Sequence, residues 1–161
     1  MSAAKQVLYR AWDALHYLSG NGSWSLSDHE RLIVNAAIRH FPEDVQRLLE
    51  AQLHQKYFVE RMSEGRINVL RFYGDNSELE IQDPRFGDML VVVRLSVDGN
   101  ERDAHVVFLR GHLFSIEFRD KSSFYADRSV EVRDVKVGSS KQTYTRAIDR
   151  LEHGKDDGLP K

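Results

Sequence analysis

Between residues 89 and 118 the chain carries three mainly apolar runs, and in the first of them Val91, Val93, Leu95 and Val97 alternate with Leu90, Val92, Arg94 and Ser96. Asp98-Gly99-Asn100 separates the first run from the second, and Arg110-Gly111 separates the second from the third. A period of two is typical of β-strands, and Asp and Gly are typical of the turns between them. Connections this short join antiparallel neighbours, because a parallel crossover needs about a dozen residues. The pattern therefore predicts three consecutive antiparallel strands.

Upstream of these strands the apolar side chains recur every three or four residues, as on one face of an α-helix. This spacing predicts helices over residues 4–19, 28–40 and 42–63. Ser27 and Glu30 have the spacing of a capping box, in which each side chain accepts a hydrogen bond from an unpaired backbone N–H group. Pro42 fits the first turn of the third helix, where no N–H group is needed. We expect this third helix to lie across the sheet.

Weaker strand patterns flank the central strands at residues 67–72, 79–81 and 129–137. Helices followed by antiparallel strands predict an α+β fold, with about three N-terminal helices packed on one face of a five- to six-stranded antiparallel meander. We expect residues 1–152 to form this single domain, with 1–64 mainly helical, 66–137 in the sheet and 141–152 in a short C-terminal helix. The polar residues 153–161 are expected to form a disordered tail.

The composition narrows the classes of function. A chain of 161 residues with 41% hydrophobic and 30% charged residues is typical of a globular domain that is stable without metals or disulfides. Its basic residues alternate with acidic ones and the net charge is −2, so we expect no nucleic-acid partner. The absence of cysteine excludes thiol nucleophiles and Cys-based zinc sites. Charges interrupt the first eighteen residues and no long apolar stretch follows, so we expect a cytoplasmic protein without a membrane segment.

Motifs for catalysis or metal binding do not emerge from the sequence. None of the seven histidines lies in an H-E-x-x-H motif, and no Gly-x-Ser-x-Gly motif or phosphate-binding loop is present. His105 and His112 would share a sheet face only with a suitable β-bulge, so we favour hydrogen-bonded positions at the sheet rim. Glu78 and Glu80 would share a face of a short strand and point to solvent, and Glu117 would form a cross-strand ion pair. We expect no catalytic residue, metal or cofactor.

Polar residues on and beside the strands are the candidates for a binding surface. They are Arg94, Arg102, His105, His112, Glu117 and Arg119. Four aromatic residues near the N-terminus have two interpretations. These residues are Tyr9, Trp12, Tyr17 and Trp24. They could form a partner-binding surface, because Trp and Tyr dominate binding hot spots, or pack the first helix onto the rest of the domain, which we favour.

The last hairpin resembles one found in small bacterial proteins. In this chain residues 104–109 are followed by Gly111-His112-Leu113-Phe114-Ser115-Ile116-Glu117-Phe118. This run is similar to a G-x-L-x-x-I-E-[FY] strand that ends an antiparallel meander preceded by helices, in a group that includes immunity proteins of bacterial polymorphic toxin systems. The resemblance covers roughly residues 49–118. It implies a helix-plus-sheet fold and a protein partner, and no catalytic residues.

Together these observations predict a non-enzymatic cytoplasmic protein that binds a protein partner or forms a homo-oligomer, with an immunity or accessory role in a bacterial system. Self-association would use an edge strand or the outer sheet face. The alternative is a small-ligand-binding protein or enzyme with a pocket between the third helix and the sheet. Tyr57, Tyr73 and Phe86 are the aromatic residues expected to line that pocket.

Overall fold

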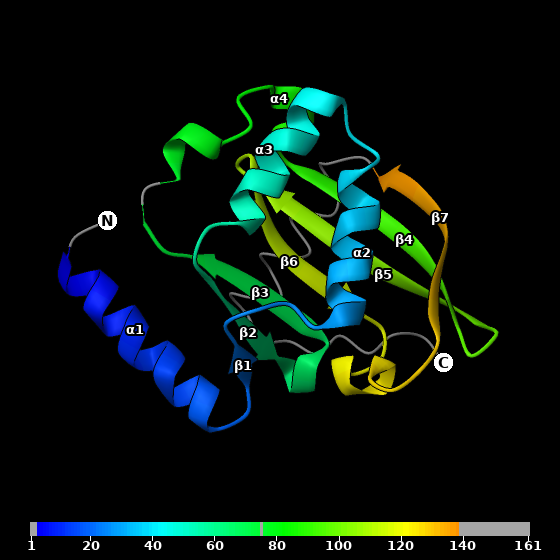
Figure 1. The fold of residues 1–161 in the computed structure, drawn as a ribbon, viewed down its shortest axis with the longest axis horizontal. Helices are drawn as coiled ribbons and strands as arrows, with labels where there is room; N and C mark the ends of the chain where they lie inside the picture. Colours follow the sequence, from blue (N-terminus) through cyan, green and yellow to red (C-terminus); the bar gives the residue numbers. More distant parts are fainter. Residues whose placement is uncertain (1–2, 75, 139–161) are drawn as a thin grey trace.

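The computed structural model describes residues 3–74 and 76–138, which form an open antiparallel sheet with helices on both faces (Figure 1). The helices of these residues are α1 (Ala3–Leu18), α2 (Asp28–Ile38), α3 (Glu43–Leu53) and the short α4 (Pro84–Gly87). Three 3₁₀ turns join the strands: η1 (Ser63–Gly65), η2 (Ser77–Leu79) and η3 (Ser122–Tyr125). The strands are β1 (Gly22–Ser23), β2 (Tyr57–Met62), β3 (Ile67–Phe72), β4 (Met89–Val97), β5 (Asn100–Leu109), β6 (His112–Phe118) and β7 (Val130–Gly138). The α+β class is confirmed.

The two central hairpins, β4–β5 and β5–β6, form as their turns predict. Asp98 and Gly99 have φ angles of 49° and 82°, and Arg110 and Gly111 have 50° and 72°. Two consecutive residues with positive φ make a type I′ turn, whose twist matches that of antiparallel strands. A bulge interrupts the second hairpin at Phe114, because Ser115 pairs with Val107 whereas Leu113 pairs with Phe108.

The sheet is not the single meander that the sequence predicts. Its seven strands follow the order β1-β2-β3-β6-β5-β4-β7. Strand β3 therefore pairs with β6, and β7 returns to pair with β4 at the other end of the sheet. The predicted strand at residues 79–81 is also wrong, because Glu78 lies in the 3₁₀ turn η2 and Glu80 follows it. The predicted C-terminal helix (141–152) and tail (153–161) lie outside the described residues.

The third helix ends ten residues earlier than its pattern predicts. Helix α3 stops at Leu53, and β2 begins at Tyr57. Aromatic and β-branched residues such as Tyr57, Phe58 and Val59 favour a strand, and all six β2 residues pair with β3. Pairing with β3 thus outweighs the helical spacing of apolar residues in this stretch.

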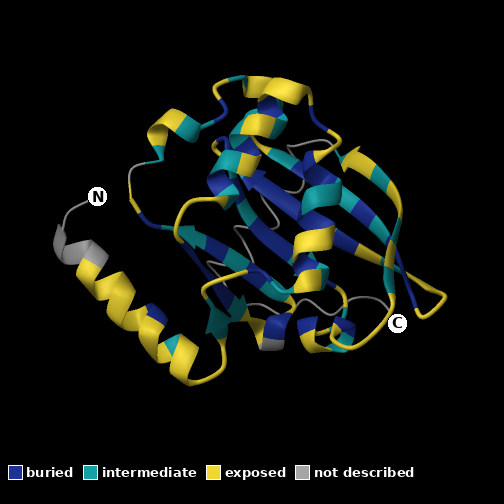
Figure 2. Ribbon diagram, in the orientation of Figure 1, coloured by how far each residue is buried: buried dark blue, intermediate teal, exposed yellow. Residues whose placement is uncertain are grey.

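The core lies between the sheet and the helices α2 and α3, which pack on one face (Figures 1 and 2). Ile33 and Val34 of α2 and Leu49 of α3 have no exposed surface. Val91 and Val93 of β4 oppose them and are equally buried. Removal of such side chains from water is the main stabilising contribution to the fold.

Helix α1 does not join α2 and α3, and this contradicts the prediction of three helices on one face. Arg61 and Asn68 hydrogen-bond Glu30 of α2, so they point to the helix-covered face of the sheet. Glu60 and Arg71 lie an odd number of positions from them and therefore point to the opposite face, which we call the outer face. These two residues are the ones that hold α1. Figure 1 shows α1 apart from α2 and α3, at one end of the molecule.

Candidate functional site

Helix α1 is attached to the sheet through its polar side. Asp13 is completely buried and forms an ion pair with Arg71. The same guanidinium lies 2.5 Å from Glu60 Oε2, so Arg71 bridges the two carboxylates. Burial raises the pKa of Asp13, and the charge of Arg71 opposes this shift. Among the α1 residues whose burial is described, Asp13 alone is buried, and it is an ionisable residue.

Aromatic side chains extend this attachment along the helix. The Trp12 indole N–H donates to Glu60 Oε1 at 3.4 Å, and His16 Nδ1 lies 3.6 Å from the same oxygen. The Arg71 guanidinium lies 5.1 Å from the centre of the Tyr9 ring, within the range of a cation–π contact. These contacts fix which side of α1 faces the sheet.

The opposite side of α1 is apolar and faces solvent. Val7 is 68%, Leu8 70%, Leu15 62% and Leu18 80% exposed. Together with the exposed Ala11, these four side chains form what we call the α1 stripe. An amphipathic helix normally buries its apolar side in the core, so the orientation of α1 is inverted (Figure 2). A contiguous exposed apolar patch of this kind marks an interaction site.

The sequence favours packing of α1 onto the domain by its N-terminal aromatic residues, and these residues do so only in part. Trp24 contacts Phe58 and Tyr73, with ring centres 4.9 and 5.8 Å apart. Trp12 and Tyr17 are more than half exposed, and Trp12 lies one turn from Leu8 and Leu15 of the α1 stripe. The apolar spacing in α1 was visible in the sequence, whereas the direction of the stripe was not. Asp13 lies opposite the apolar side, as charged residues do on any amphipathic helix, so the sequence carried no signal of the inverted orientation.

The outer face of the sheet brings together three of the predicted binding residues. His105 lies directly opposite Glu117 on the neighbouring strand, and Arg94 lies opposite Asp103 with their side chains 3.4 Å apart. Alternation places Arg94, His105 and Glu117 on the same face of the sheet. Exposed pairs such as Arg94–Asp103 contribute little to stability.

The other predicted binding residues lie elsewhere. Arg102 is opposite the buried Leu95, so it points to the helix-covered face, where it pairs with Asp120 at 2.9 Å. Arg119 follows β6 and is exposed. His112 pairs with Leu109, which lies four residues after His105 on β5, so the two histidines are not neighbours. The described residues contain no cluster of three or more His, Cys, Asp or Glu side chains that could hold a metal ion.

The aromatic residues predicted to line a pocket do not share one. Tyr57 packs against Phe72, and Phe86 packs against Phe41. Tyr73 is buried beside Trp24. Between α3 and β6 the completely buried Gln52 side chain accepts a hydrogen bond from the Leu113 N–H group.

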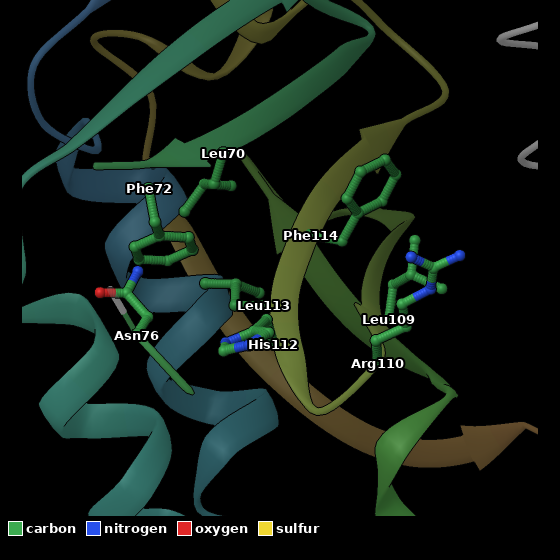
Figure 3. A pocket seen from close by; sticks show the side chains of 8 residues that line it. All are labelled: Leu70, Phe72, Asn76, Leu109, Arg110, His112, Leu113 and Phe114. Atoms are coloured by element: carbon green, nitrogen blue, oxygen red, sulfur yellow. The ribbon is translucent and has the colours of Figure 1, made fainter. Parts of the chain in front are cut away.

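A pocket opens instead between the ends of β3 and β6. The two strands pair over three rungs, the last of which joins Val69 to Ser115, and no pairing follows. The opening has a volume of about 250 Å³. It is lined by Leu70, Phe72, Asn76, Leu109, Arg110, His112, Leu113 and Phe114. In Figure 3 the side chains of β3 lie toward Leu113 and His112 of β6.

Two polar atoms at this pocket lack a hydrogen-bond partner among the described residues. They are His112 Nδ1 and Asn76 Oδ1, and both are buried. The remaining lining is mainly apolar, and Arg110 is its charged member. His112 was among the predicted binding residues, whereas Asn76 was missed because the preceding turn gave no pattern that places it beside β6.

Neither a protein-family model, nor a curated protein, nor a solved structure matches this chain. The α1 stripe and the pocket between β3 and β6 are therefore the features of the described residues that bear on function.

Among the described residues, no helix is both long and apolar enough to cross a membrane.

We expect the free energy of unfolding to decrease as the pH is lowered, because of His112. Burial lowers the pKa of His112 below its ordinary value of 6.5, against the opposing charge of Glu80. The unfolded chain then binds more protons than the folded one, so unfolding becomes more favourable as the pH falls below about 6.5 and is unaffected above it. Thermal melts across this window should show a shallower slope for His112→Leu than for the wild type. An unchanged slope for His112→Leu would contradict the assignment.

Proposed function

We propose that this protein is a non-enzymatic module that binds another protein chain through the α1 stripe. The observation that carries the proposal is the inverted orientation of α1, which leaves Val7, Leu8, Leu15 and Leu18 largely exposed. Leu8, Ala11, Leu15 and Leu18 follow the i, i+3, i+7 and i+10 spacing with which amphipathic helices bind apolar surfaces. A protein partner would remove this surface from water.

The attachment of α1 suits this role. The ion pairs of Arg71 with Asp13 and Glu60 fix the helix from behind, so its apolar side is presented in one orientation. A fixed binding element loses less conformational entropy on association than a mobile one. Trp12 lies one turn from Leu8 and Leu15 and is of a residue type that dominates binding energy. Binding of this kind is what an immunity or accessory protein requires.

Site-specific photo-cross-linking in cells that produce the protein tests the proposal. A photoreactive amino acid at position 15 should give a cross-linked product, and the Leu8→Lys substitution should abolish it by placing a charge in the interface. The same photoreactive residue at position 32, an exposed leucine of α2, provides the matched control. A product from position 32 that is as abundant as that from position 15 would contradict the proposal.

The pocket between β3 and β6 favours a second candidate function, the binding of a small molecule. Its apolar lining and the Arg110 side chain suit a small aromatic compound with an acidic group. Nuclear magnetic resonance titration with indole and with benzoate tests this role. Shifts confined to pocket residues and lost in His112→Leu would support it, whereas no shifts at millimolar concentration of either compound would contradict it.

A further inference from the structure

We propose that the chain bound by the α1 stripe is a second copy of this protein, with the two α1 helices packed antiparallel about a two-fold axis near Ala11. This inference rests on the proposed function, because it names the partner of the same surface. Three properties of the described residues support it: the spacing of the stripe, its area and its place at the end of the molecule.

The stripe is complementary to itself. Ala11 lies near its middle, with Leu8 on one side and Leu15 and Leu18 on the other. In an antiparallel pair centred on Ala11, Leu8 of one copy lies beside Leu15 of the other. The small Ala11 side chains allow close approach at the axis, and the larger leucines fill the space on both sides. A two-fold axis satisfies both copies with the same contacts, as in most homodimers.

The area of the stripe is sufficient for a weak dimer. With Val7, Leu8, Leu15 and Leu18 exposed by 62% to 80%, each stripe offers on the order of 500 Å² of apolar surface. Two stripes would bury about 1,000 Å² in total, which is the lower limit for a specific interface. We therefore expect a dissociation constant in the micromolar range rather than an obligate dimer.

The rest of the molecule leaves room for this arrangement. Helix α1 lies at one end of the domain, away from α2 and α3 (Figure 1). The edge strand β7, by contrast, carries exposed charges at Glu131, Arg133, Asp134 and Lys136. Charged edge strands oppose strand-to-strand association. The structure thus favours α1 over the sheet edge, which is one of the two surfaces that the sequence suggested for self-association.

Sedimentation velocity of the full chain over a range of concentrations tests the proposal. The wild type should change from monomer to dimer as its concentration rises through the micromolar range. The Leu8→Lys/Leu15→Lys variant should raise the dissociation constant by at least about 100-fold, because each lysine removes a central apolar contact and adds a charge. Both leucines are exposed, so the fold should remain intact by circular dichroism. The control Leu32→Lys alters an exposed leucine of α2 and should dimerise like the wild type.

A cross-linking measurement locates the axis. The natural chain has no cysteine, so a single Ala11→Cys substitution provides the only thiol. Diamide, a two-electron oxidant, should join two such chains into a disulfide-linked dimer faster than it joins chains of the Leu32→Cys control. Equal rates, or a wild type that stays monomeric at every concentration, would overturn self-pairing.

The outcomes separate this inference from the proposed function. If the chain is monomeric and position 15 still cross-links to a different protein in cells, the self-pairing is wrong and the binding role of the α1 stripe stands. If position 15 cross-links to nothing and the chain is monomeric, both are wrong. If the product from position 15 contains two copies of this chain, both are supported.

Discussion

The Glu30→Ala substitution is expected to lower the free energy of unfolding by about 3 kcal/mol, because it breaks a buried ionic network. Glu30 is completely buried at the start of α2. Its carboxylate accepts hydrogen bonds from Arg61 at 3.0 Å, from Asn68 at 2.7 Å and from Ser122 at 3.1 Å. It also accepts the Ser27 N–H group at 2.8 Å, as its place in the capping box predicts. One side chain therefore joins α2 to β2, β3 and η3.

The size of the loss follows from what remains after the change. Alanine would leave the Arg61 charge without its partner and the Asn68 amide donor unsatisfied, whereas the Ser122 hydroxyl would keep its contact with His29 Nε2 at 3.0 Å. Removing one partner of a buried ion pair costs about 3–5 kcal/mol, and we expect the lower value because the Arg61 side chain is 20% exposed and can be partly hydrated.

Chemical denaturation of matched variants measures this effect. Glu30→Gln keeps the shape and one acceptor oxygen, so it should lose less stability than Glu30→Ala. Glu50→Ala removes an exposed glutamate of α3 and should change the free energy of unfolding by no more than about 0.5 kcal/mol. A loss for Glu30→Ala as small as that for Glu50→Ala would show that the network does not stabilise the fold.

The second large effect is expected for Gln52→Leu, which should also lower the free energy of unfolding by about 3 kcal/mol. The buried Gln52 amide donates to the Leu79 carbonyl at 2.7 Å and to the Gly111 carbonyl at 2.8 Å, and it accepts the Leu113 N–H at 3.1 Å. Leu113 pairs with Phe108 of β5 on one side, and Gln52 supplies its N–H group with a partner on the other side, beyond the last rung that β6 forms with β3. Leucine has a similar volume but leaves the Leu79 carbonyl and the Leu113 N–H buried without these partners.

Two measurements separate this explanation from a general loss of packing. Hydrogen exchange of the Leu113 amide should become faster in Gln52→Leu, because its acceptor is gone. Gln52→Glu should be at least as destabilised at neutral pH, because a carboxylate cannot donate to the two carbonyls, and it should recover stability when acid protonates it. Gln55→Leu, at an exposed position just after α3, is the control. Equal stability of Gln52→Leu and Gln55→Leu would contradict the role of Gln52.

These two side chains also matter for the candidate sites. Gln52 fixes the β5–β6 hairpin that forms one wall of the pocket, so its loss should disturb the pocket. The Glu30 network lies on the helix-covered face of the sheet, whereas α1 is attached to the outer face through Asp13, Glu60 and Arg71. Variants of Glu30 should therefore lower stability without changing which side of α1 faces solvent.

Local chemistry determined the parts of the fold that the sequence predicts correctly. The Asp98-Gly99 and Arg110-Gly111 turns specify two hairpins because Gly99 and Gly111, and Asp98 in the first turn, readily accept positive φ. Alternation then fixed the buried faces of β4, β5 and β6, and the Ser27–Glu30 spacing fixed the start of α2. These features depend on residues close together in the chain, so their pattern is readable without the rest of the molecule.

Contacts between distant residues decided everything else. Residues 57–62 have apolar positions that continue a helix, and pairing with β3 made them a strand. The β3–β6 pairing and the return of β7 to β4 set the order of the sheet and opened the pocket. The orientation of α1 was decided by Arg71, 58 positions from Asp13, since an ion pair with a buried carboxylate held the polar side of the helix inward. The sequence by itself determined that α1 has an apolar side, and only the tertiary structure turned that side to solvent.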